Sequence, residues 1–163
     1  MVLPAVADLS PVTAAVIGCG NPNRRDDGAG PAVIARLRQA GVGGAGLFDA
    51  GTDGMAVLYA ARGCRRLIIV DAARTGAVPG AIYEVPGEIL AAPHRPGMTL
   101  HDFRWDHALH AGRRIYGDQF PGEVTVLLIE AGDLDFGLGL TPPVATAVEA
   151  VATRIARLLE PAP

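Results

Sequence analysis

The sequence predicts an α/β fold: a three-layer sandwich in which helices cover both faces of a mostly parallel, twisted sheet of about five strands, one of them an antiparallel edge strand. Three observations lead to this prediction. Short apolar runs alternate with stretches of helical period along the 163 residues. The runs at 66–71 and 123–130 are almost continuously apolar, as in strands buried on both faces. A glycine-rich turn at 18–30 follows the first such run, where open α/β sheets place their ligands.

The elements can be placed along the chain. We expect strands at 13–18, 47–49, 66–71, 81–85 and 123–130, and helices at 28–39 and after Gly54, Thr99 and Thr141. The run at 81–85 follows the third strand with no room for a crossover helix, which predicts the antiparallel edge strand. We expect residues 1–12 to be a loose extension, 13–160 a single domain, and the proline-rich stretch 86–98 a mobile loop.

Two helix starts have sequence signatures. Thr99, followed three residues later by Asp102, predicts a capping box, and Thr141 followed by Pro142 is typical of a helix start. The helix after Thr99 should bury one apolar face, which comprises Trp105, Ala108, Leu109, Gly112, Ile115 and Tyr116.

Composition excludes several classes of function. The net charge of -3 and the lack of a basic segment argue against binding to nucleic acid or to an anionic membrane. Two cysteines are too few for a disulfide framework. No apolar run approaches the roughly 20 residues of a membrane span. We therefore expect a soluble, cytoplasmic and monomeric protein.

Acidic residues stand where the sheet should end. Asp26 and Asp27 follow the first strand, and either could cap the next helix. One helix start needs only one cap, and adjacent like charges repel, so at least one of the pair is a candidate functional group. Asp71 ends the third strand, which should neighbour the first, so it should lie near this turn.

His101 is the histidine best placed to join these acids. In the first turn of the helix expected after Thr99, the helix dipole would disfavour the imidazolium, and a neutral ring can bind a metal. A solvent-facing histidine is the alternative. Two carboxylates and one imidazole suit divalent Zn, Ni, Mn or Fe. His94, His107 and His110 are expected to be surface residues.

Two other sites fit the same turn. Gly18-x-Gly20 begins a dinucleotide-binding fingerprint, and Asp49 could bind a ribose, but Asn23 stands at the third glycine position and two carboxylates would face the pyrophosphate. Cys19 could be a nucleophile with His101 nearby, although a cysteine between two glycines is more often a small apolar filler.

An ordered set of motifs carries a family resemblance. The motifs are Gly18-x-Gly20-Asn21, Asp26-Asp27-Gly28-x-Gly30, Asp49-Ala50-Gly51-Thr52-x-Gly54-Met55, Ile68-Ile69-Val70-Asp71-Ala72, Pro79-Gly80, Leu100-His101-Asp102-Phe103, Ala108-Leu109 and Gly139-Leu140-Thr141-Pro142. With them the sequence resembles the nickel-iron hydrogenase maturation endopeptidases, from about residue 15 to residue 159. Segments 104–107 and 129–132 differ from the commonest versions in that family.

The resemblance implies a function and a site. It implies a metal-dependent aspartate-type endopeptidase that removes a C-terminal extension from the nickel-loaded precursor of a hydrogenase large subunit. Asp27, Asp71 and His101 would bind the metal and act in catalysis. The nickel would be carried by the substrate, with another divalent metal possible. Substrate contacts would come from Gly18, Gly20, Asn21, Asp49, Gly51, Thr52 and Gly54. A nickel-binding chaperone and a generic peptidase on the same fold are alternatives.

Overall fold

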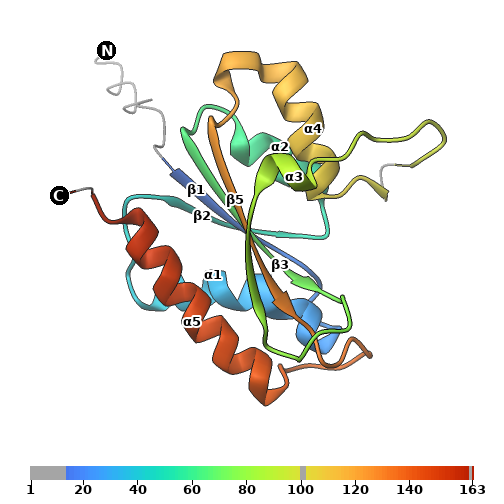
Figure 1. Cartoon of the computed structure of the whole chain (residues 1–163), viewed down its shortest axis with the longest axis vertical. Helices are drawn as coiled ribbons and strands as arrows, with labels where there is room; N and C mark the ends of the chain where they lie inside the picture. The colour runs from blue at the N-terminus through green and yellow to red at the C-terminus, as the bar shows by residue number, and fades with distance from the viewer. Residues whose placement is uncertain (1–13, 100–101, 162) are drawn as a thin grey trace, which may run out of the picture.

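The computed structural model describes residues 14–99, 102–161 and 163, and a five-stranded sheet forms its centre (Figure 1). The strands are β1 (Ala14–Cys19), β2 (Gly46–Gly51), β3 (Arg66–Ala73), β4 (Ile82–Pro86) and β5 (Glu123–Glu130). Their spatial order is β2-β1-β3-β5-β4. All neighbours are parallel except β4, which pairs antiparallel with β5 at the edge. The expected mixed sheet with one antiparallel edge strand is confirmed.

Helices cover both faces of this sheet, as predicted. Helices α1 (Ala29–Gln39) and α5 (Pro142–Leu159) pack together on one face, and α2 (Gly54–Ala61) and α4 (Trp105–Tyr116) on the other (Figure 1). A single helical turn, α3 (Gly87–Leu90), follows β4, and 3-10 turns occur at Arg25–Gly28 and Gly117–Gln119. Among the helices in the described part of the chain, none is long and apolar enough to cross a membrane.

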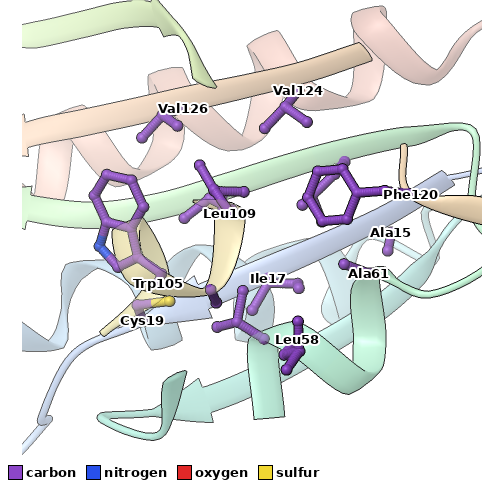
Figure 2. Packing of buried hydrophobic residues seen from close by; sticks show 14 of the residues in the cluster. Ala15, Ile17, Cys19, Leu58, Ala61, Trp105, Leu109, Phe120, Val124 and Val126 are labelled. Carbon is purple, nitrogen blue, oxygen red and sulfur yellow. The ribbon is translucent and has the colours of Figure 1, made fainter. Parts of the chain in front are cut away.

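Strand β3 shows how one apolar run serves two cores. Ile68 and Val70 join the cluster under α1 and α5. Leu67 and Ile69 join the cluster under α2 and α4, which Figure 2 shows from close by. Side chains alternate between the two faces of a strand, so Asp71 falls on the α2/α4 side. The pattern that buries the strand therefore also decides which helices its terminal carboxylate meets.

Four expectations about the segment before and within α4 are corrected. The helix begins at Trp105, later than Thr99. The Asp102 carboxylate does accept the N–H and hydroxyl of Thr99, at 2.9 and 3.0 Å, but these bonds close a turn ahead of the helix. Ile115 is exposed, because it lies at the end of α4 beyond the sheet. His107 is buried and accepts the backbone N–H of Arg104, whereas we expected a surface residue.

Two further expectations have mixed outcomes. The stretch predicted as a loop, 86–98, begins with the last residue of β4 and the helical turn α3, because Gly87 packs against Val124 of β5. His94 is exposed as expected and His110 is half-buried. The extension expected at residues 1–12 lies outside the described residues.

The start of α1 lies in direct contact with the sheet. A Cβ atom on Gly30 would lie 2.3 Å from the Cys19 carbonyl oxygen and 2.6 Å from that of Val70. A Cβ on Gly18 would lie 2.4 Å from the Gly30 carbonyl oxygen. The two glycines thus let α1 approach β1 and β3 closely enough to fix the turn between them.

We predict that Gly30→Ala lowers the free energy of unfolding by about 3 kcal/mol, because the added methyl group meets backbone atoms that cannot move independently. Urea unfolding followed by circular dichroism measures this loss. Gly43→Ala is the matched control, since nothing lies within 4 Å of a Cβ at that position. An equal effect of both substitutions would contradict the close-contact explanation.

Candidate active site

The adjacent acids of the first turn have different surroundings, beginning with the fully buried Asp26. Its carboxylate accepts the backbone N–H groups of Gly132, Asp133 and Thr141 at 2.7–2.9 Å, and the Thr141 hydroxyl at 2.8 Å. Burial by itself raises the pKa of Asp26, but these bonds outweigh it, so the pKa is lowered. Thr141 precedes α5 as predicted, yet its hydroxyl binds Asp26 instead of capping its own helix.

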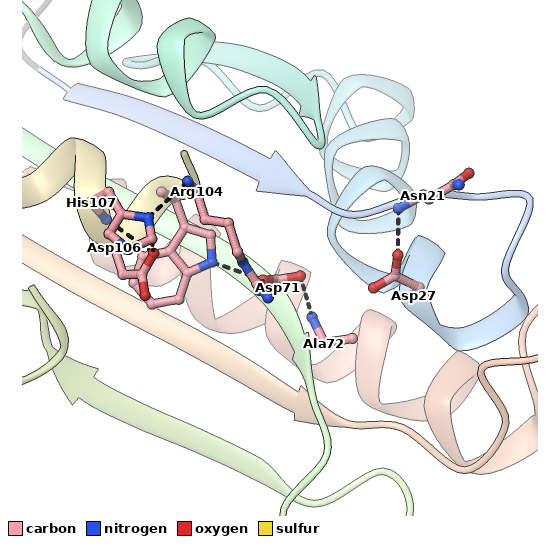
Figure 3. A network of polar contacts seen from close by, with 8 residues as sticks. Asn21, Asp27, Asp71, Ala72, Arg104, Asp106 and His107 are labelled. Carbon is pink, nitrogen blue, oxygen red and sulfur yellow. Dashed lines mark hydrogen bonds and ion pairs between the residues drawn. The ribbon is translucent and has the colours of Figure 1, made fainter. Parts of the chain in front are cut away.

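Asp27 is half-buried and less fully bonded. One carboxylate oxygen, Oδ2, accepts the N–H of Asn21 at 2.8 Å (Figure 3). Gly20 makes this turn possible: its φ is 130°, and a Cβ there would lie 1.8 Å from the Asp27 carbonyl oxygen. In the described part of the chain, no residue donates a hydrogen bond to Oδ1 of Asp27. That oxygen is available to a ligand.

Asp71 is the buried acid of the site. Its Oδ1 accepts the N–H of Ala72 at 2.8 Å, and its Oδ2 accepts the indole N–H of Trp105 at 2.8 Å (Figure 3). An Arg104 nitrogen lies 3.3 Å from the same Oδ2. Burial raises the pKa of Asp71 to about 6, although the Trp105 bond and the Arg104 charge oppose it; the charge of Asp27 adds to the rise.

Asp27 and Asp71 line one cavity of about 200 Å³ at the carboxyl edge of the sheet. The pairing of β1 with β3 brings them together, as the sequence predicted. A larger hollow lies beside Ala14 at the amino edge, but parallel sheets bind ligands at the carboxyl edge, and the acidic cavity is therefore the candidate site. Its lining comprises Cys19, Gly20, Asp27, Gly51, Thr52, Asp53, Gly54, Val57, Asp71, Arg104 and Trp105.

The substrate contacts expected from sequence divide into two groups. Gly20, Gly51, Thr52 and Gly54 line the cavity. The others lie outside the lining: Gly18 packs against α1, the Asn21 N–H supports Asp27, and the exposed Asp49 accepts the N–H of Gly51 at 3.0 Å. The motif positions therefore include residues that shape the walls of the cavity as well as residues that face it.

The third expected ligand, His101, lies outside the described residues. Within residues 14–99, 102–161 and 163, no group of three or more histidine, cysteine, aspartate or glutamate side chains is placed to hold a metal ion. The described ranges thus contribute two of the three expected ligands, Asp27 and Asp71, and leave the triad as a prediction.

The two alternative sites fit this geometry poorly. Burial, with the nearby Asp71 charge, raises the pKa of the Cys19 thiol far above its usual range, so the nucleophilic thiolate is scarce. A phosphate at the glycine turn would need free backbone donors, but the Asn21 N–H already binds Asp27. The two carboxylates suit a cation or proton transfer better than a phosphate.

Trp105 and Arg104 are site residues that sequence reasoning missed. Trp105 was expected on the apolar face of its helix, and its ring is indeed buried, but its indole N–H fixes Asp71. Thirty-four residues separate the two. The departure of segment 104–107 from the commonest family pattern was the available signal, and it gave no role to either residue.

Fold and cavity together define a class: a doubly wound α/β protein with a carboxylate pair at the carboxyl edge of its sheet. The comparisons with known proteins identify the family. A family model described as hydrogenase maturation protease matches residues 32–158. The hydrogenase 3 maturation protease of Escherichia coli (strain K12) is 30% identical over 149 residues, which are 88% of this chain and 89% of that protein. The chain belongs to the hydrogenase maturation protease family and is a peptidase.

Solved structures agree with this assignment. A crystal structure of the hydrogenase 3 maturation protease superposes with a TM-score of 0.70 at 29% identity, covering 89% of this chain and 90% of that one. The hydrogenase maturation protease HybD from Thermococcus kodakarensis gives a TM-score of 0.71 at 22% identity, covering 90% and 99%. The second match supports the fold alone.

We predict that Asp26→Asn lowers the free energy of unfolding at pH 7 by about 2 kcal/mol, because an amide cannot accept all of the bonds that the carboxylate accepts. The folded-state pKa of Asp26 is lowered, so its contribution is complete above the unfolded value near 4 and is lost as the pH falls further. Urea unfolding at several pH values measures both effects. Asp135→Asn, an exposed acid of the loop after β5 that Asp26 binds, should change little; a parallel loss in both variants would count against the buried network.

Proposed function

We propose that this chain is an endopeptidase that removes a C-terminal extension from the nickel-loaded precursor of a nickel-iron hydrogenase large subunit. Membership of the hydrogenase maturation protease family supports this reaction class. The observation that carries the proposal is the convergence of Asp27 and Asp71 on one cavity at the carboxyl edge of the sheet. A peptide next to a metal ion needs such a cavity, with acidic groups and open access.

We infer that Asp27, Asp71 and His101 form the metal-reading site, which means that they bind the metal ion of the loaded precursor and so detect its presence. The oxygen ligands of these two carboxylates suit a divalent ion. Oδ1 of Asp27 accepts no hydrogen bond from the described residues, and the buried carboxylate of Asp71 is compensated only by the exposed Arg104. Nickel would arrive as cargo of the substrate, and another divalent metal could take the same ligands. When present, the ion would polarise the scissile carbonyl or an attacking water.

Residues of the chain itself can also take part in proton transfer. A pKa near 6 keeps Asp71 ionised at neutral pH while leaving it basic enough to accept a proton from water. The Trp105 indole and the Ala72 N–H hold both carboxylate oxygens in place. Asn21 orients Asp27 in the same way through one hydrogen bond. We therefore propose that Asp71 is the general base of an aspartate-type, metal-dependent endopeptidase.

The walls of the cavity suit an extended peptide. Gly20, Gly51, Thr52 and Gly54 contribute mostly backbone and small side chains to the lining. We propose that these residues bind the chain around the scissile bond. We propose that the protein acts as a monomer. The free thiols of Cys19 and Cys64 are compatible with a reducing, cytoplasmic location.

The loop between β5 and α5 offers a docking surface for the folded part of the precursor. Phe136 and Leu138 are exposed at 81% and 78%, unusually high for large apolar side chains. Their loop is rigidly tied to the site: Gly137 exchanges backbone hydrogen bonds with Asn23 and Arg25, and Asp26 binds Gly132 and Thr141. We propose that the precursor packs on Phe136 and Leu138 while its tail enters the cavity.

We predict that replacing both Phe136 and Leu138 by Ser weakens association with the nickel-loaded precursor about 10-fold, through the loss of buried apolar area. Surface plasmon resonance with immobilised precursor measures the affinity. Replacement of the exposed Ile115, which lies on α4 beyond the sheet, is the matched control. Unchanged affinity in the double variant would remove this loop from the docking surface.

The decisive test of the proposed function follows the mass of the substrate. Purified protein is mixed with nickel-loaded large-subunit precursors, and intact mass spectrometry detects loss of one C-terminal peptide. Asp27→Asn, Asp71→Asn and His101→Ala should each reduce the cleavage rate by roughly 100-fold or more. Asp118→Asn, an exposed acid of the Gly117–Gln119 turn, is the matched control, and Cys19→Ser should still cleave because the raised pKa of the Cys19 thiol leaves little nucleophilic thiolate.

The outcomes separate the competing functions. Stable association without loss of mass, for every precursor tried, would replace the endopeptidase by a nickel-binding chaperone. Cleavage of unrelated peptides at the same rate would indicate a generic peptidase. Equal rates with nickel-free precursor would keep the enzyme and discard recognition of the substrate's metal.

A further inference from the structure

We propose that Arg104 is a displaceable counter-ion for Asp71: it pairs with this carboxylate while the site is metal-free, and it must move away before a divalent ion can bind. The ion pair would make the site bind free ions weakly and favour nickel that the substrate holds in place. The inference rests on the proposed function in taking Asp71 as a metal ligand.

The two partners of this ion pair differ greatly in exposure. The Arg104 nitrogen lies 3.3 Å from Oδ2 of Asp71, yet the arginine side chain is 63% exposed and that of Asp71 only 5%. An exposed guanidinium gains little from such a pair and can swing into solvent at small cost. A buried carboxylate, in contrast, loses much of its stabilisation when its counter-cation leaves and nothing replaces it. Exchange of Arg104 for another cation is therefore the favourable route.

Charge in the cavity leads to the same conclusion. Among the described residues that line it, Arg104 has the only basic side chain; it contacts the carboxylate of Asp71, and Asp27 lines the same cavity. The remaining acid of the lining, Asp53, accepts the N–H of Met55 and caps α2. A divalent ion that entered with Arg104 still in place would meet an additional positive charge within a few ångströms. Binding of the ion and retention of the ion pair thus oppose each other.

The side chain of Arg104 makes no capping hydrogen bond with the described residues at the start of α4. At the start of α4, it is the backbone N–H of this residue that bonds to Nδ1 of His107, at 3.1 Å. Within the described residues, the hydrogen bond and ion pair of its guanidinium lead to Asp71. A substitution that removes the charge should therefore leave the start of the helix intact.

Trp105 supplies a direct signal for the exchange. It is the only tryptophan of the chain. Its indole N–H donates to the same Oδ2 that Arg104 contacts. A change of cation at this oxygen alters the field at the indole, so its fluorescence reports on the occupancy of Asp71.

The test compares binding of free Zn²⁺ and Ni²⁺ by the metal-free full-length protein, using Trp105 fluorescence and isothermal titration calorimetry. We expect Arg104→Met to bind the free ions about 10-fold more tightly than the wild type, and Arg104→Lys to stay close to the wild type. Arg113→Met is the matched control, because Arg113 is an exposed arginine of the same helix that pairs with Glu88 instead. Equal or weaker binding by Arg104→Met would overturn the proposal.

An Asp71→Asn variant separates this proposal from the proposed function. If wild-type binding disappears in Asp71→Asn but is unchanged in Arg104→Met, the carboxylate is a ligand and only the counter-ion role fails. If Asp71→Asn binds free ions as well as the wild type and still cleaves the nickel-loaded precursor, the metal-reading role of Asp71 fails, and the counter-ion role with it. Tighter binding in Arg104→Met, with a fluorescence change that Asp71→Asn abolishes, supports both.

Discussion

The buried carboxylate of Asp26 is the interaction on which the carboxyl edge of the sheet depends. It lies in the turn after β1, and its four hydrogen bonds lead to the loop after β5 and the residue before α5. Two strand-to-helix loops that are more than a hundred residues apart in sequence are thereby held together. Asp27, the next residue, receives its position from this arrangement. The structural acid and the candidate functional acid are consecutive because the first fixes the second.

Local sequence patterns could not divide these roles, although the family resemblance assigned the functional one to Asp27. Two adjacent aspartates before a helix suggested that one was a cap and the other was functional, but neither caps α1 by a side-chain bond. The roles depend on the loop after β5, whose backbone donors face Asp26. A similar arrangement at Glu130 underlines the point, since that buried acid at the end of β5 binds Thr75 and Gly76 of the turn after β3. Asp26 and Glu130 are thus structural acids, because the backbone of neighbouring loops occupies their oxygens.

Much of the fold was predictable because it follows from local patterns. Continuous apolar runs identified β3 and β5, and the short connection before β4 identified the antiparallel edge. The proximity of Asp71 to the first turn followed from strand order alone. The predictions for the start of α4 and for His107 were wrong because both depend on how this helix packs against α2 and the shared core. The contact between Trp105 and Asp71 was missed for the same reason: it joins two elements through tertiary packing.

The buried position of Asp71 disfavours its ionised carboxylate, and this unfavourable burial indicates a role beyond structure. Burial raises its pKa to about 6 even though an indole, a backbone N–H and a guanidinium all favour the ionised form. A carboxylate needed only for structure would be surrounded like Asp26, by enough donors to lower its pKa. The negative charge of Asp71 is instead compensated only in part, by one exposed arginine. Under the proposed function, a protease that distinguishes a nickel-loaded precursor from a nickel-free one would gain from this incomplete compensation, because free ions would compete with Arg104 whereas a metal fixed in a docked substrate would arrive with binding energy from the whole interface.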